Sequence, residues 1–137
     1  MTEETVDTQV IANLVVRDPE GRVLFVRYDP ENEKWWLPGK DVAPYTHPDE
    51  TAAAVLAAVE GLAVDSTELS HVESFRGRRG WHLVFNYDVR ATGAPGGSDE
   101  AQWFDAEALP RTVHGAWEKQ VVARVTAGQA GRDHSAA

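Results

Sequence analysis

The sequence predicts one α/β domain of the α+β kind, and three observations indicate it. Several short segments rich in Val, Ile, Leu and aromatic residues are separated by turn-forming residues, which is typical of strands. An uncharged run rich in Ala, Val and Leu follows Glu50 and indicates a helix. The 137 residues suffice for one hydrophobic core without disulfide or metal support. We therefore expect a single domain over residues 1–127 and a disordered tail over 128–137.

The first strand-like segments lie near the start of the chain. Residues 8–17 and 22–28 predict two strands, joined by the turn-forming sequence Asp-Pro-Glu-Gly at 18–21. Arg27 shares one face of the second strand with apolar residues, because side chains alternate between the two faces of a sheet. A polar loop over 29–34 follows.

A central helix is predicted over residues 48–60. Pro48 occupies the first helical position, where a backbone N–H would have no partner, and Gly61 comes just past the end. The residue before Pro48 is His47, and imidazole is a poor N-cap compared with a hydroxyl. Thr46, one residue earlier, is the alternative cap.

The second half of the chain predicts a hairpin, a short strand and a closing helix. Residues 69–75 and 81–90 are strand-like and flank an Arg- and Gly-rich turn at 76–80. A short strand is expected over 102–105, and a helix over about 113–126. That helix would present one apolar face, formed by Val113, Trp117, Val121 and Val125.

Composition excludes several classes of function. The net charge of −9 disfavours binding to nucleic-acid phosphates, which requires clustered Lys and Arg. The absence of cysteine excludes disulfides, thiolate nucleophiles and Cys-based zinc sites. The longest apolar run, 52–59, is too short to cross a bilayer, and the acidic N-terminal residues differ from a signal peptide. We expect a cytoplasmic protein that binds a small molecule rather than a nucleic acid or a membrane, and a homodimer is left open.

The spacing between two short motifs carries a family resemblance. Trp-Trp-Leu-Pro-Gly at 35–39 resembles the segment that precedes the Nudix box, G-x5-E-x7-R-E-U-x-E-E-x-G-U, and Gly-Leu at 61–62 resembles the end of the box; U is a bulky aliphatic residue. The order of predicted elements over about 8–125 is also similar to the Nudix fold. The resemblance implies an αβα sandwich, with a mixed sheet between the central helix 48–60 and the C-terminal helix.

The residues that bind Mg²⁺ in the Nudix family are replaced in this sequence. Without a gap, the box places Lys40 at its first Gly, Thr46 at its first Glu, Ala54-Val55 at Arg-Glu, and Ala58-Val59 at Glu-Glu. Mg²⁺ requires oxygen ligands, supplied mainly by carboxylates, and alkyl groups cannot provide them. We therefore expect no metal site of the family type and no cofactor.

The replaced positions share one predicted helix face, which reads Val55, Ala58, Val59 and Leu62. Exposed apolar surface is unfavourable, so we expect this face to be covered by protein, a subunit partner or an apolar ligand. Glu60 is about 100° further around a helix and is expected to point elsewhere.

Candidate catalytic residues are His47, Asp41 and Glu60. The imidazole of His47 has a near-neutral pKa suited to proton transfer. No pattern in the sequence orients any of the three, so the catalytic residues stay unknown.

Candidate ligand-binding residues follow from the resemblance. Arg27 lies on the second strand, from which family members often contact substrate, and Lys40 stands beside the replaced metal positions. Trp36 is an aromatic residue that a ligand can stack on. Val55 and Val59 complete the set because they lie on the apolar face.

Three hypotheses follow. The first is a Nudix-fold binding or regulatory protein for a small or nucleotide-like ligand, without pyrophosphohydrolase activity. The second is a repurposed enzyme that performs metal-free acid–base chemistry on a partly apolar substrate. The third is a hydrolase of nucleoside diphosphate derivatives with displaced metal ligands, drawn from Asp41, Glu60, Asp99 and Glu100.

Overall fold

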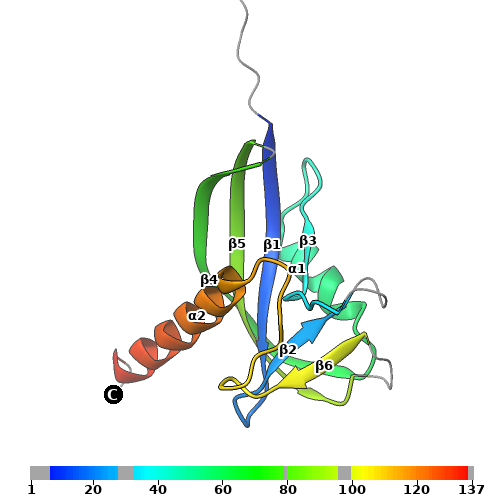
Figure 1. The fold of residues 1–137 in the computed structure, drawn as a ribbon, viewed down its shortest axis with the longest axis vertical. Coiled ribbons are helices and arrows are strands. Elements are labelled where there is room, and N and C mark those ends of the chain that lie inside the picture. Colours follow the sequence, from blue (N-terminus) through cyan, green and yellow to red (C-terminus); the bar gives the residue numbers. More distant parts are fainter. Residues whose placement is uncertain (1–6, 28–32, 79, 96–99, 136–137) are drawn as a thin grey trace, which may run out of the picture.

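The computed structural model describes residues 7–27, 33–78, 80–95 and 100–135 (Figure 1). In these ranges the chain forms one six-stranded mixed sheet and two helices, so the predicted α+β class is confirmed. The strand order is β4-β5-β1-β2-β6, and β3 pairs with β1. The elements are β1 (Thr8–Arg17), β2 (Val23–Val26), β3 (Gly39–Asp41), α1 (Pro48–Ala57), β4 (Leu62–Gly77), β5 (Gly80–Gly93), β6 (Ala101–Phe104) and α2 (Ala116–Ser135).

Strand β1 lies at the centre of the sheet, parallel to β5 and antiparallel to β2 and β3. Its apolar residues alternate between two cores. Leu14 and Val16 pack with Leu56 of α1, whereas Val15 packs with Val121 and Val125 of α2. The two helices therefore cover opposite faces of the sheet, as the αβα arrangement implies.

Two polar residues of β1 lie on its otherwise apolar α2 face, and both are paired with β5. The Asn13 side chain donates to Asn86 Oδ1 at 2.8 Å. Arg17 Nη2 donates to Asp88 Oδ1 at 2.9 Å, and both side chains are buried. Buried polar groups of this kind require partners, so they fix the register of β1 against β5.

Helix α1 begins at the predicted residue and ends earlier than predicted. It spans Pro48–Ala57, with Ala58 as its C-cap. Gly61 has φ +80° and turns the chain into β4, whose first residue pairs with Gly93. The need to enter β4 ends the helix before residue 60. His47, not Thr46, is the N-cap, because its Nδ1 accepts a hydrogen bond from the Asp49 N–H at 3.1 Å.

The β4–β5 hairpin is longer than the predicted strands 69–75 and 81–90. Polar residues in the first part of β4 hide the alternation, and two register shifts interrupt its period. They lie between Val64 and Ser66 and between Leu69 and His71. β4 pairs on one side only, with β5, within the described chain.

Helix α2 begins and ends later than the predicted range 113–126. A turn with Gly115 at φ +64° precedes it, so Val113 lies outside the helix. Residues 128–135, expected in a disordered tail, continue the helix, and Gly128 does not end it. Neither helix in the described ranges combines the length and apolar character needed to span a bilayer.

Candidate functional site

A cavity of about 590 Å³ lies where the C-terminal end of α1 meets β3 and the adjoining ends of β2 and β6. Four charged residues and a larger set of uncharged ones line it. The charged residues are Arg27, Lys40, Glu60 and Glu100; the others are Val26, Pro38, Gly39, Ala54, Val55, Ala58, Val59, Pro95 and Ala101. The cavity therefore combines an apolar wall with groups of both charges.

Alkyl groups form the side of the cavity that α1 provides. Val55 and Val59 are half-buried, and Ala58 is exposed. Protein of the same chain therefore covers this face only in part, and its covering by a subunit partner or an apolar ligand stays a prediction. Leu62 was expected on the same face, but it lines a different cavity because the helix ends before it.

Glu60 lines the cavity, although the predicted helix placed it on another face. The reason is again the early end of α1, since Glu60 sits in the turn that follows Ala57 rather than on the helix. Glu100 approaches from the start of β6, and its carbonyl accepts a hydrogen bond from the Arg27 N–H at 2.8 Å. The Arg27 guanidinium lies 4.7 Å from the ring centroid of Trp35, a cation–π distance.

The donor set does not fit the Mg²⁺ site that the fold family implies. The α1 side of the cavity carries no oxygen ligand, and Glu60 and Glu100 are the lining carboxylates. Within the described ranges, no three His, Asp or Glu side chains are grouped as a metal site. Asp99, which was considered as a displaced ligand, lies outside the described residues.

Three of the candidates predicted from sequence do not line this cavity. His47 is at the opposite end of α1, with its side chain 67% exposed. Asp41 is exposed in β3, where it pairs with Ile11. Trp36 packs edge-to-face against His114, with ring centroids 5.2 Å apart.

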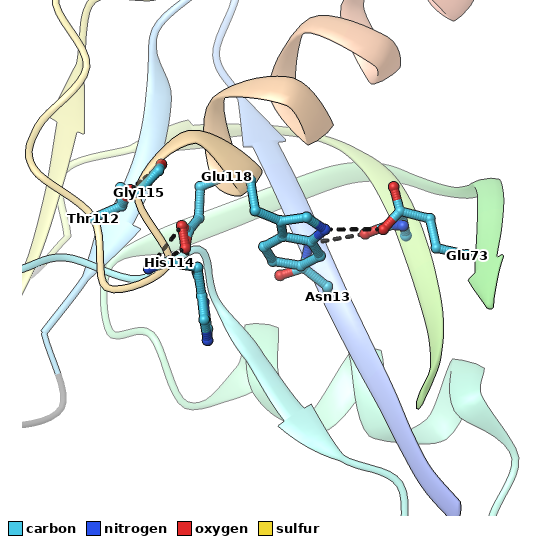
Figure 2. Close-up of polar contacts among 8 residues, drawn as sticks. Asn13, Glu73, Thr112, His114, Gly115 and Glu118 are labelled. Atoms are coloured by element: carbon cyan, nitrogen blue, oxygen red, sulfur yellow. Dashed lines mark hydrogen bonds and ion pairs between the residues drawn. The ribbon is translucent and has the colours of Figure 1, made fainter. Parts of the chain in front are cut away.

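His114 and Glu118 form a polar cluster that the sequence did not predict (Figure 2). The buried Glu118 carboxylate accepts hydrogen bonds from the backbone N–H of His114 at 2.7 Å and contacts its Nδ1 at 2.8 Å. The imidazole also contacts Trp117, with ring centroids 5.6 Å apart. The spacing of four residues was a usable signal, but the predicted helix start at 113 concealed the turn that brings these groups together.

A second polar network on the α2 side of the sheet connects β4, β5, β1 and α2. Trp117 Nε1 donates to Glu73 Oε2 at 3.0 Å (Figure 2), and Glu73 Oε1 lies 3.5 Å from His71 Nε2. The same His71 nitrogen is 3.3 Å from Asn86 Nδ2, and Asn86 in turn accepts from Asn13. Burial, and secondarily the charge of Arg124, lower the pKa of His71.

Solved structures identify the fold. No family model matches the sequence, and no curated protein matches it. A UDP-X diphosphatase superposes with a TM-score of 0.70 at 17% identity, over 95% of this chain and 66% of that one, which is less than two thirds of its length. A MutT NUDIX hydrolase from Burkholderia pseudomallei has a TM-score of 0.65 at 18% identity, with 87% of this chain and 98% of that chain covered.

A NUDIX hydrolase from Nitrosomonas europaea also superposes, with a TM-score of 0.65 at 16% identity, over 89% of this chain and 90% of that chain. The chain therefore has the Nudix fold, as the sequence predicted. Similarity at these identities shows the fold and leaves the activity to the residues of the site.

Proposed function

We propose that this protein is a Nudix-fold binding or regulatory protein for a small, partly apolar or nucleotide-like ligand, without Mg²⁺-dependent pyrophosphohydrolase activity. One observation supports this most strongly. Ala54 and Val55 of α1, together with Ala58 and Val59 just past its end, line the cavity at the positions where the Nudix box has its Arg-Glu and Glu-Glu pairs. Mg²⁺ catalysis in phosphoryl chemistry depends on oxygen ligands that these side chains lack.

The cavity lining indicates the chemistry of the ligand. Val55 and Val59 are half-buried in the free protein, and covering their remaining apolar surface stabilises a complex by about 25 cal/mol per Å². Arg27 and Lys40 are the basic residues among those that line the cavity, and the Arg27 guanidinium also lies over the Trp35 ring. A ligand with an apolar body and an anionic group satisfies both parts of this lining.

Filling the cavity tests the proposal. Ala58→Phe places a ring in the space that the exposed Ala58 methyl group borders. We expect uridine diphosphate or phenylacetate, added in the presence of EDTA, to shift amide NMR signals of Lys40 and Val59 in the wild type. The Ala58→Phe variant should show no such shifts.

Ala57→Phe is the matched control, because Ala57 is the adjacent exposed alanine and lines the other cavity. It should leave binding of both probes unchanged. Shifts that persist in Ala58→Phe, or that map away from this cavity, would contradict the proposal. The proposal would also be contradicted if neither probe shifted any signal of the wild type.

A hydrolase with displaced metal ligands is the second candidate function. It is favoured by one observation, the presence of Glu60 and Glu100 in the same cavity. Mg²⁺ in proteins is often held by one or two carboxylates together with substrate phosphates. Mg²⁺-dependent turnover that is lost in Glu60→Gln would support this candidate over the binding protein.

The repurposed acid–base enzyme has less support. Neither His47 nor Asp41 lines the cavity, so its proposed proton-transfer groups are not beside the apolar wall. His114 has an oriented carboxylate partner, but Glu118 also accepts the His114 backbone N–H at the start of α2, which is the role of a helix cap.

A further inference from the structure

A second cavity, of about 620 Å³, lies between α1 and the β4–β5 hairpin. It does not share residues with the first cavity, and the adjacent alanines Ala57 and Ala58 line one each. Its walls are apolar and come from both elements. They are formed by Ala53, Leu56 and Ala57 of α1 and by Leu62, Val64 and Leu69 of β4.

The irregular pairing of β4 shapes this cavity. Register shifts follow Val64 and Leu69, and the segment between them pairs Thr67 with Val89 and Leu69 with Tyr87. Val89 and Tyr87 belong to the core beneath α1, so their partners on β4 lie on the same face. Val64 and Leu69 remain 42% and 49% exposed beside the helix. Exposure of apolar side chains to water is unfavourable, so a ligand that covered them would be stabilised.

Polar groups form one end of the cavity. The Tyr87 hydroxyl donates to Asp49 Oδ1 at 2.6 Å, and burial together with this hydrogen bond raises the pKa of Tyr87, so the hydroxyl stays a donor. His47 Nδ1 accepts the Asp49 N–H at 3.1 Å and lies 3.7 Å from Asp49 Oδ2. The Asp49 carboxylate is thereby held at the cavity rim, with its side chain 70% exposed.

We propose that this cavity binds a small apolar amine, with the hydrocarbon part against the alanine, leucine and valine walls and the ammonium group against Asp49. A carboxylate fixed by a tyrosine donor is a suitable partner for an ammonium ion, and such charge-assisted hydrogen bonds are the stronger kind. Among the described residues that line this cavity none is Lys or Arg, so the Asp49 carboxylate favours a cationic ligand over an anionic one. This site is separate from the one proposed above and does not depend on it.

Benzylammonium and its uncharged analogue benzyl alcohol provide the test. Titration of isotope-labelled full-length protein should shift the amide signals of Ala53, Thr67 and Leu69 with benzylammonium. Asp49→Asn should weaken benzylammonium binding by about tenfold while leaving the weaker binding of benzyl alcohol unchanged. Ala57→Phe should abolish binding of both compounds.

Ala58→Phe is the matched control, because it alters only the first cavity, and it should bind benzylammonium like the wild type. Thermal melting of each variant checks that it is folded. The proposal is overturned if the shifts map to the first cavity, if Ala57→Phe retains them, or if Asp49→Asn binds both compounds as the wild type does. It is equally overturned if benzylammonium shifts no signal up to its solubility limit.

Discussion

Four small side chains, at the C-terminal end of α1 and just beyond it, line one side of the first cavity. Ala54, Val55, Ala58 and Val59 present only alkyl groups to it, so its ionic chemistry rests on residues from other elements. Arg27 and Lys40 bring positive charge, and Glu60 and Glu100 bring negative charge. Ligand selectivity at this cavity should therefore depend on these four charged residues more than on α1.

The buried carboxylate of Glu118 should contribute to stability. It accepts the His114 backbone N–H and contacts the imidazole, while being 1% exposed. Glu118→Gln replaces a charged acceptor with an amide that cannot accept through both terminal atoms, which should lower the free energy of unfolding by roughly 1–3 kcal/mol. Urea denaturation measures this loss. The exposed Glu107→Gln change should have little effect, and equal stability of the two variants would contradict the assigned role.

His71 should make stability depend on pH. Burial lowers its pKa in the folded protein below the ordinary value of 6.5. Below about pH 6.5 the unfolded chain binds a proton that the folded chain does not, so stability falls as the pH decreases towards the folded-state pKa. The wild type should therefore lose more stability between about pH 7.5 and about pH 5.5 than His71→Gln does in urea denaturation. Identical pH dependence in the two proteins would exclude this contribution.

The residues of the first cavity could be predicted only where the resemblance fixes the spacing. Val55, Val59, Lys40 and Arg27 all line it, as their positions in the Nudix pattern imply. Glu60 was placed elsewhere because its direction depends on where the helix ends. A glycine that follows a predicted helix locates the last helical residue only to within a few positions.

At the scale of elements, a buried ion pair joins β1 to its parallel neighbour β5. Arg17 and Asp88 are 2.9 Å apart, with side chains 9% and 3% exposed. Arg17 Nε has no acceptor within the described residues, so the guanidinium relies on this carboxylate. Such a pair is costly to break because the remaining charge stays buried.

Asp88→Asn should therefore destabilise the protein by about 3–5 kcal/mol. Guanidinium chloride denaturation gives the change in the free energy of unfolding. Asp65→Asn, an exposed change on β4, should alter it by less than about 0.5 kcal/mol. A similar small effect for Asp88→Asn would show that the pair does not support the β1–β5 register.

Element boundaries were the least predictable part of the fold. The first part of β4 contains Asp65, Ser66 and Glu68, so local pattern does not show a strand there. Pairing with the long β5 supplies the hydrogen bonds that make it one. Similarly, the turn at 112–115 sets the start of α2 through tertiary contacts, including the β-bridge between Trp35 and Thr112.

At the scale of the whole molecule, α1 separates two cavities of similar size and different chemistry. The first cavity is lined by basic and acidic residues as well as apolar ones. The second is lined mainly by apolar residues, with the Asp49 carboxylate at its rim. The α2 side of the sheet instead carries a polar network, buried at Asn13 and Asn86 and partly buried elsewhere, that joins four elements. The two cavities therefore lie around α1, and the polar structural contacts lie beneath α2.

The most direct test of the central claim is turnover by the wild-type protein. Purified protein is incubated with UDP-glucose, ADP-ribose and nucleoside triphosphates in millimolar Mg²⁺ or Mn²⁺, and products are followed by ³¹P NMR. We predict no hydrolysis above the protein-free control, because α1 offers the cavity no metal ligand. Metal-dependent hydrolysis that disappears in Glu60→Gln or Glu100→Gln would contradict the claim and establish a hydrolase with displaced ligands.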